Sequence, residues 1–178
     1  MKRQRRRILC GLLAALCLLP ASGAAAKTST VTSFQPMSAK KYGVPVSSIR
    51  RHEGDFSLRW GGLDLSRDIA FDIKNKDFQN GTFLMWVYST NATKLDFTVT
   101  LLSDNPETGE TDGYRAGFWN YWIGWRQLKW ESGSDDFTVI GDPLGYDKVT
   151  KIVLSAAPGE RSTVGTELYL DSLMFRQK

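Results

Sequence analysis

The sequence predicts an all-β domain, an antiparallel two-sheet β-sandwich of the jelly-roll type. Short runs in which apolar and polar side chains alternate recur along the chain, and clusters of Gly, Pro, Asn and Asp separate them. No segment keeps the 3.6-residue period of an amphipathic helix. About eight such strands, joined by short turns, are typical of a sandwich. Because the chain has no internal repeat, we expect one domain.

Residues 1–26 have the pattern of a secretory signal peptide. Five basic residues precede an apolar run from Ile8 to Leu19, and small residues follow, ending at Ala24 and Ala26. The apolar run is too short to span a bilayer core of about 30 Å as a lasting anchor. We therefore expect cleavage near Lys27, a secreted or periplasmic protein, and no membrane association afterwards.

Removing this leader changes the charge and the cysteine content. The 178-residue chain has 23 Lys and Arg against 19 Asp and Glu, and five of the basic residues but none of the acidic ones lie in residues 1–26. The remaining 18 basic and 19 acidic residues give no bulk positive charge to attract nucleic acid. Both cysteines, Cys10 and Cys17, are lost with the leader, so the mature domain must be held together by its core.

Residues 27–47 are rich in Ser, Thr and Lys, which predicts a linker or an irregular lead-in before a single domain over residues 48–178. Within the domain, strands are expected where the alternation is regular, in residues 56–60, 69–73, 95–101, 151–156 and 165–175. Residues 82–90 differ, because both faces of this stretch are apolar. Such a strand either lies in the centre of a sheet or has one face in the core and the other in a ligand groove.

The stretch from Tyr114 to Trp130 contains four of the six tryptophans. A short break centred on Asn120 divides it into two strands or one strongly bent ribbon, because dense aromatic residues favour pleated, half-buried surfaces. Most of these rings are expected in the core, and one or two are expected to form a stacking platform for a flat ligand such as a sugar ring. Six tryptophans are more than one sandwich core readily buries, which favours binding.

The residues available for catalysis are few. The chain has one histidine, His52, and no cysteine after leader cleavage, so Cys/His and Ser/His/Asp arrangements and zinc-ligand spacings are missing. Asp135 and Asp136 point in opposite directions on an extended chain, unlike the converging carboxylates of a glycoside hydrolase. We therefore expect a non-enzymatic domain.

The order of several short motifs resembles the non-catalytic N-terminal β-sandwich of chondroitin-sulfate and related polysaccharide lyases and, more broadly, galactose-binding-like jelly-roll modules. These motifs are Gly54 to Trp60, Gly124-Trp125-Arg126 with Trp130, and Glu167 to Leu173, within a resemblance over residues 48–176. No counterpart of the helical catalytic domain of these lyases precedes Lys178. The resemblance therefore implies the binding half without lyase activity.

Two functions follow from the rings and the resemblance. The first is a secreted, non-catalytic carbohydrate-binding module that binds polysaccharide or oligosaccharide by stacking pyranose rings on exposed aromatics. The second is a structural or interaction domain that accompanies a separately encoded polysaccharide-degrading enzyme, a lyase, without binding sugar. The predicted sugar-binding residues, with Arg126 donating to a hydroxyl or a carboxylate, are Trp86, Tyr88, Trp119, Trp122 and Arg126.

The resemblance also implies a structural calcium ion. Jelly-roll modules of this kind often hold one where the entrance of the first strand meets the closing strand, which here places Glu53 and Asp55 near Asp171. Calcium takes six to eight oxygen ligands, so these carboxylates with loop carbonyls would suffice. Alternatively, Asp171 caps a turn or pairs with a basic side chain.

Overall fold

The computed structural model describes residues 26–34, 43–73, 76–108, 111–156 and 165–178. The predicted signal peptide lies outside these residues, except for Ala26. Among the described residues, no helix is long and apolar enough to cross a membrane.

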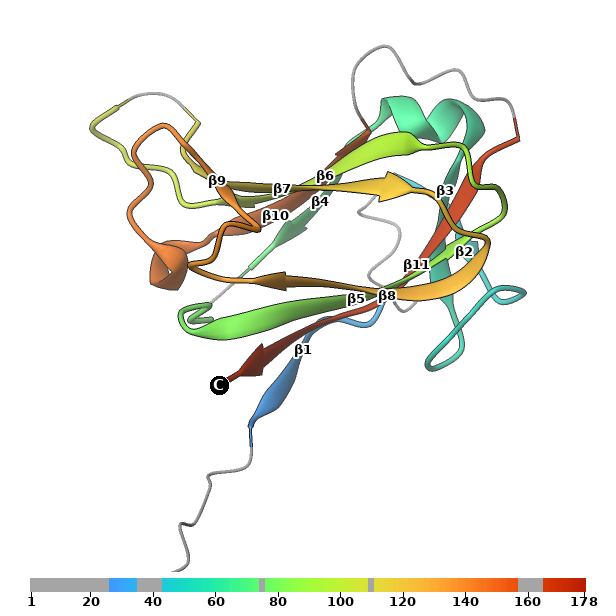
Figure 1. The fold of residues 1–178 in the computed structure, drawn as a ribbon, viewed down its shortest axis with the longest axis horizontal. Helices are drawn as coiled ribbons and strands as arrows, with labels where there is room; N and C mark the ends of the chain where they lie inside the picture. The colour runs from blue at the N-terminus through green and yellow to red at the C-terminus, as the bar shows by residue number, and fades with distance from the viewer. Residues whose placement is uncertain (1–25, 35–42, 74–75, 109–110, 157–164) are drawn as a thin grey trace, which may run out of the picture.

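The strands form two antiparallel sheets that face each other, which confirms the predicted β-sandwich (Figure 1). Sheet A has the order β2-β3-β11-β5-β8, and β1 also pairs with β11. Its strands are β1 (Thr28–Thr32), β2 (Val46–Ser47), β3 (Ser57–Gly61), β5 (Gly81–Ser89), β8 (Gly124–Glu131) and β11 (Glu167–Gln177). Sheet B has the order β4-β10-β6-β7-β9. Its strands are β4 (Ile69–Asp72), β6 (Leu95–Leu102), β7 (Gly113–Asn120), β9 (Thr138–Ile140) and β10 (Lys151–Ala156).

The core lies between the sheets and is built by the alternation in the sequence. In β5, Phe83, Met85 and Val87 are buried against residues of sheet B, whereas Trp86 and Tyr88 lie on the outer face and are only partly buried. This confirms the predicted division of the two apolar faces of this strand. A β-strand that is apolar on both sides fits a position between β11 and β8 in the sheet.

Two stretches differ from their predicted conformation. Residues 27–47 were expected to be a linker, yet they contain β1, which pairs with β11, and β2, which pairs with β3. The Thr-rich β1 pairs with β11 beyond the point where β3 leaves it, so it extends the sheet along an edge that would otherwise be open. In β11, a bulge follows Asp171, and Ser172 has a φ of 46°. The bulge interrupts the regular alternation predicted for residues 165–175, so Leu173 lies in the core although Asp171, two residues earlier, lies on the outer face.

The packing of β7 against β6 allows a test of the fold. A Cβ atom at Gly113 would collide with the carbonyl oxygen of Leu101 on β6, whereas one at Gly117 of the same strand would lie no closer than 3.7 Å, to Asp96 Oδ1. We expect Gly113→Ala to lower the free energy of unfolding by about 1–3 kcal/mol, because the overpacked strand must shift. Gly117→Ala should change it by no more than about 0.5 kcal/mol. Urea unfolding of both variants measures the difference, and equal stabilities would contradict this register.

Candidate functional site

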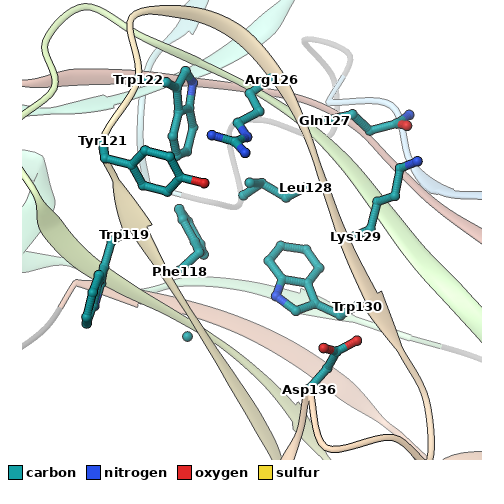
Figure 2. Close-up of a pocket in the computed structure, with 11 residues that line it drawn as sticks. Phe118, Trp119, Tyr121, Trp122, Arg126, Gln127, Leu128, Lys129, Trp130 and Asp136 are labelled. Atoms are coloured by element: carbon teal, nitrogen blue, oxygen red, sulfur yellow. The ribbon is translucent and has the colours of Figure 1, made fainter.

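A groove runs along one side of the sandwich, between β7 of sheet B and β8 of sheet A (Figure 2). Its volume is 450 Å³, within the range of about 300–1,000 Å³ usual for small-molecule sites. Consecutive residues of β8 line it, so it follows the edge of that strand rather than one face of the sheet. The lining residues are Gly117, Phe118, Trp119, Tyr121, Trp122, Arg126, Gln127, Leu128, Lys129, Trp130 and Asp136.

The floor of the groove is apolar and firmly supported. Phe118 stacks on Phe97 of the core at a ring-centroid distance of 5.2 Å and contacts Trp130 at 5.8 Å. Trp130 is buried, and Leu128 packs beside it. Because Trp130 belongs to the sandwich core and Phe118 and Leu128 pack against that core, the floor is preformed.

The rim is formed where β7 ends. Asn120 is fully buried, its side-chain NH2 group donates to Asn91 O at 2.8 Å, and its backbone carbonyl accepts the N–H of Lys94 at 2.7 Å. The chain then turns sharply, and the Tyr121 N–H donates to Trp119 O at 3.0 Å. The predicted break at Asn120 is confirmed as the end of the strand, and the buried amide fixes where the aromatic rim begins.

Three rings at this rim have different exposures. Trp119 is 65% exposed and Tyr121 is 57% exposed. Trp122 is partly buried, and its indole N–H donates to Gly124 O at 3.1 Å. Trp119 is among the residues that line the groove, and Figure 2 shows its ring on the far side of the β7 ribbon from Phe118, pointing away from the floor into solvent. An exposed indole costs hydration free energy unless a ligand covers it, so Trp119 is the ring most available for stacking.

Arg126 of β8 reaches into this end of the groove. Its guanidinium carbon lies 4.6 Å from the centroid of the Tyr121 ring and 5.6 Å from that of Trp122 (Figure 2). Cation–π contacts of this kind hold a guanidinium in place with about 0.5–1 kcal/mol each at exposed sites. The structure thus brings three predicted residues, Trp119, Trp122 and Arg126, to one groove.

The other two predicted sugar-binding residues, Trp86 and Tyr88, lie elsewhere, on the outer face of sheet A. The loop before β3 covers their rings. His52 stacks on Trp86 with a centroid distance of 3.7 Å and an angle of 17°, and Arg50 lies 4.8 Å over Tyr88. Trp125 completes this cluster through an edge contact with His52 at 5.3 Å. A sugar ring could stack on the covered face of Trp86 only if His52 moved away.

The structure also does not bring the side chains of the three predicted calcium ligands, Glu53, Asp55 and Asp171, together in one group. Asp171 is fully buried, and its Oδ2 accepts the backbone N–H groups of His52 at 2.6 Å and Glu53 at 3.0 Å. Ser172 donates its hydroxyl to the other oxygen at 3.1 Å. In the described part of the chain, no group of three or more His, Cys, Asp or Glu side chains is placed to hold a metal ion. The alternative role of Asp171, capping a turn, agrees with these contacts.

Several residues of the groove were not predicted from the sequence. Tyr121, Lys129 and Asp136 line it, and Asp136 Oδ2 also accepts the N–H of Glu131 at 2.8 Å. The position of Tyr121 directly after the Asn120 break was a usable signal, since residues at a strand end are often exposed. Nothing in the local sequence placed Asp136, whose role depends on the turn after β8.

Comparison with known proteins identifies the fold. No family model matches the chain, and a search of curated proteins finds no match. A solved structure with a similar fold is the family 11 carbohydrate-binding module of a cellulosomal cellulase of Clostridium thermocellum, with a TM-score of 0.51 and 12% identity over 88% of this chain and 85% of that one. The family 11 module of C. thermocellum in complex with a β-1,3-1,4-mixed-linked tetrasaccharide gives a TM-score of 0.51 and 14% identity, covering 87% and 85%. The chain therefore has the jelly-roll β-sandwich fold of carbohydrate-binding modules.

The contacts of Asp171 give the second prediction. We expect Asp171→Ala to lower the free energy of unfolding by about 2 kcal/mol, because it removes a charged acceptor from two backbone N–H groups. Asp55→Ala is the matched control: Asp55 is exposed, and its loss should cost no more than about 0.5 kcal/mol. Urea unfolding with and without EDTA measures both effects. A destabilisation by EDTA that either substitution abolishes would restore the calcium site.

Proposed function

We propose that this protein is a non-catalytic carbohydrate-binding module that binds polysaccharide in the groove between β7 and β8. The observation that carries the proposal is Trp119, a tryptophan 65% exposed at the edge of a preformed groove with an apolar floor. Pyranose rings present C–H faces that pack on indole rings, and their hydroxyls need donors and acceptors at the sides of the ring. Arg126 supplies donors and Asp136 supplies acceptors along this groove.

The groove suits an extended polymer better than a compact ligand. It follows the length of β8, from Arg126 to Trp130, and these residues span about 13 Å at 3.3–3.4 Å per residue. The shared fold agrees with this reading, and the similar module of C. thermocellum is recorded in complex with a tetrasaccharide. The alternative, a structural domain that accompanies a polysaccharide-degrading enzyme without binding sugar, leaves the exposed rim without a role.

For Trp86 and Tyr88 we propose a different task from the one predicted. Their rings support His52 and Arg50, and with Asp171 they hold the loop before β3 on sheet A. Calcium is not part of this proposal, because the Asp171 carboxylate already accepts three hydrogen bonds. An association with a separately encoded lyase stays a prediction, because no feature of the groove supports or contradicts it.

Substitution of Trp119 tests the proposed site. We expect Trp119→Ala to weaken polysaccharide binding about five- to tenfold, because one aromatic stacking contact contributes on the order of 1 kcal/mol. Isothermal titration against a panel of neutral and uronic-acid polysaccharides, including mixed-linked β-glucan, measures this effect. Ile49→Ala is the matched control, since Ile49 is 86% exposed but lies outside the groove.

Two results would contradict the proposal. If the wild-type protein binds no polysaccharide of the panel at millimolar concentration, it is not a binding module for these glycans. If Trp86→Ala abolishes binding while Trp119→Ala does not, the sugar site lies on the outer face of sheet A instead.

Export of the protein stays a prediction with a direct test. We expect the exported protein to begin near Lys27, because Ala24 and Ala26 provide the small residues that signal cleavage requires. Intact mass spectrometry of the exported protein measures the position of the N-terminus. A mature species that still contains Cys10 and Cys17 would contradict the prediction.

A further inference from the structure

The charged side chains of the groove differ in where they point and in whether another residue already contacts them. Arg126, Lys129 and Asp136 are the charged side chains among the described residues that line it. Figure 2 shows Arg126 pointing between the two strands, whereas Lys129 points away from the floor. Asp136 lies at the opposite end from Trp122 and accepts the N–H of Glu131. The end of the groove formed by Trp122 and Tyr121 is therefore positive, and Arg126 is its charge.

Among the residues that the structure describes, Arg126 has no anionic partner. In the part of the chain that the structure describes, no carboxylate lies within ion-pair distance of its guanidinium, and no hydrogen bond links it to another residue; its contacts are the two rings. Arg59, by comparison, forms an ion pair with Glu167 on the outer face of sheet A. Aromatic contacts with the faces of a guanidinium leave the N–H groups at its edge unused.

These two ring contacts also prepare Arg126 for a ligand. A free arginine side chain loses about 2 kcal/mol of rotamer entropy when it is fixed, and Tyr121 and Trp122 already restrict it before binding. The two rings are consequently occupied by Arg126, and Trp119 is the rim aromatic that remains open to a sugar. The site thus combines one stacking ring with one fixed, planar set of donors.

From this arrangement we infer that the groove selects glycans that contain uronic acids, with a sugar carboxylate bound by the guanidinium of Arg126. A carboxylate is planar and accepts two parallel N–H bonds from a guanidinium, whereas a hydroxyl accepts only one. The inference rests on the proposed function, since it names the class of glycan that the same groove takes. Tyr121 and Trp122 are positioning residues in this site.

The test compares each uronate polymer with its own neutral form. The probes are polygalacturonate, alginate and hyaluronan, each beside the same polymer after chemical reduction of its carboxyl groups to hydroxymethyl groups, with dextran sulfate as a sulfated polyanion. We expect the protein to bind at least one uronate polymer about tenfold more tightly than the reduced form. Arg126→Gln should remove this preference, and added salt should reduce it.

Matched variants separate this effect from a general loss of charge. Arg115→Gln removes an exposed arginine of β7 that does not line the groove, and it should leave the preference unchanged. Arg126→Lys keeps the charge but loses the planar donor pair, so it should recover only part of the preference. Circular dichroism of each variant checks that the fold is intact.

Each contrary outcome has its own meaning. Binding of neutral polymers that depends on Trp119 but not on Arg126 would overturn the uronate inference and leave the proposed function standing. Equal, Arg126-dependent binding of dextran sulfate would show a general anion site and would also overturn it. Failure to bind any polymer, charged or reduced, would overturn the proposed function and the inference together.

Discussion

The candidate site depends on one crossing of the chain between the two sheets. β7 lies in sheet B and β8 in sheet A, and only Tyr121, Trp122 and Ile123 separate the two strands. Packed sheets are about 10 Å apart, so strands joined in this way cannot pair with each other. Their facing sides leave a groove, and the short connection places its aromatic residues at the end of that groove. The buried amide of Asn120 fixes where the crossing starts.

Two clusters of partly exposed aromatic residues in this domain have different physical roles. On the outer face of sheet A, His52 stacks on Trp86 and meets the edge of Trp125, whereas Tyr88 contacts Trp125 and lies under Arg50. These rings are therefore covered by other residues of the protein. At the groove, Tyr121 and Trp122 contact Arg126, and the ring of Trp119 remains in solvent. A count of tryptophans could not distinguish these groups, because the difference lies in what covers each ring.

The alternation of side chains predicted the sandwich and the core face of β5, and the break in the aromatic stretch predicted the end of β7 at Asn120, because each of these features is marked by a local run of the sequence. Within the groove, Trp119 and Trp122 were predicted from the dense aromatic residues around the Asn120 break, and Arg126 was predicted as a donor to the sugar. The contact of His52 with Trp86 and the hydrogen bonds of Asp171 join residues more than 30 and more than 115 positions apart, respectively. No local pattern reports such pairs. The bulge at Ser172 also interrupts the regular alternation that was predicted for residues 165–175.

The pairing of β1 with β11 determines how the domain would respond to mechanical force. Thr28 lies opposite Arg176, and Lys27 O accepts the N–H of Gln177, so both ends of the described core emerge at the same end of one antiparallel pair. A pull applied through Lys27 and Lys178 would load these hydrogen bonds one after another, as a zipper opens, rather than all together in shear. The strand β1 would detach first. The groove lies beyond β11 and β5 in the same sheet, so detachment of β1 would leave the strands that line it paired as before.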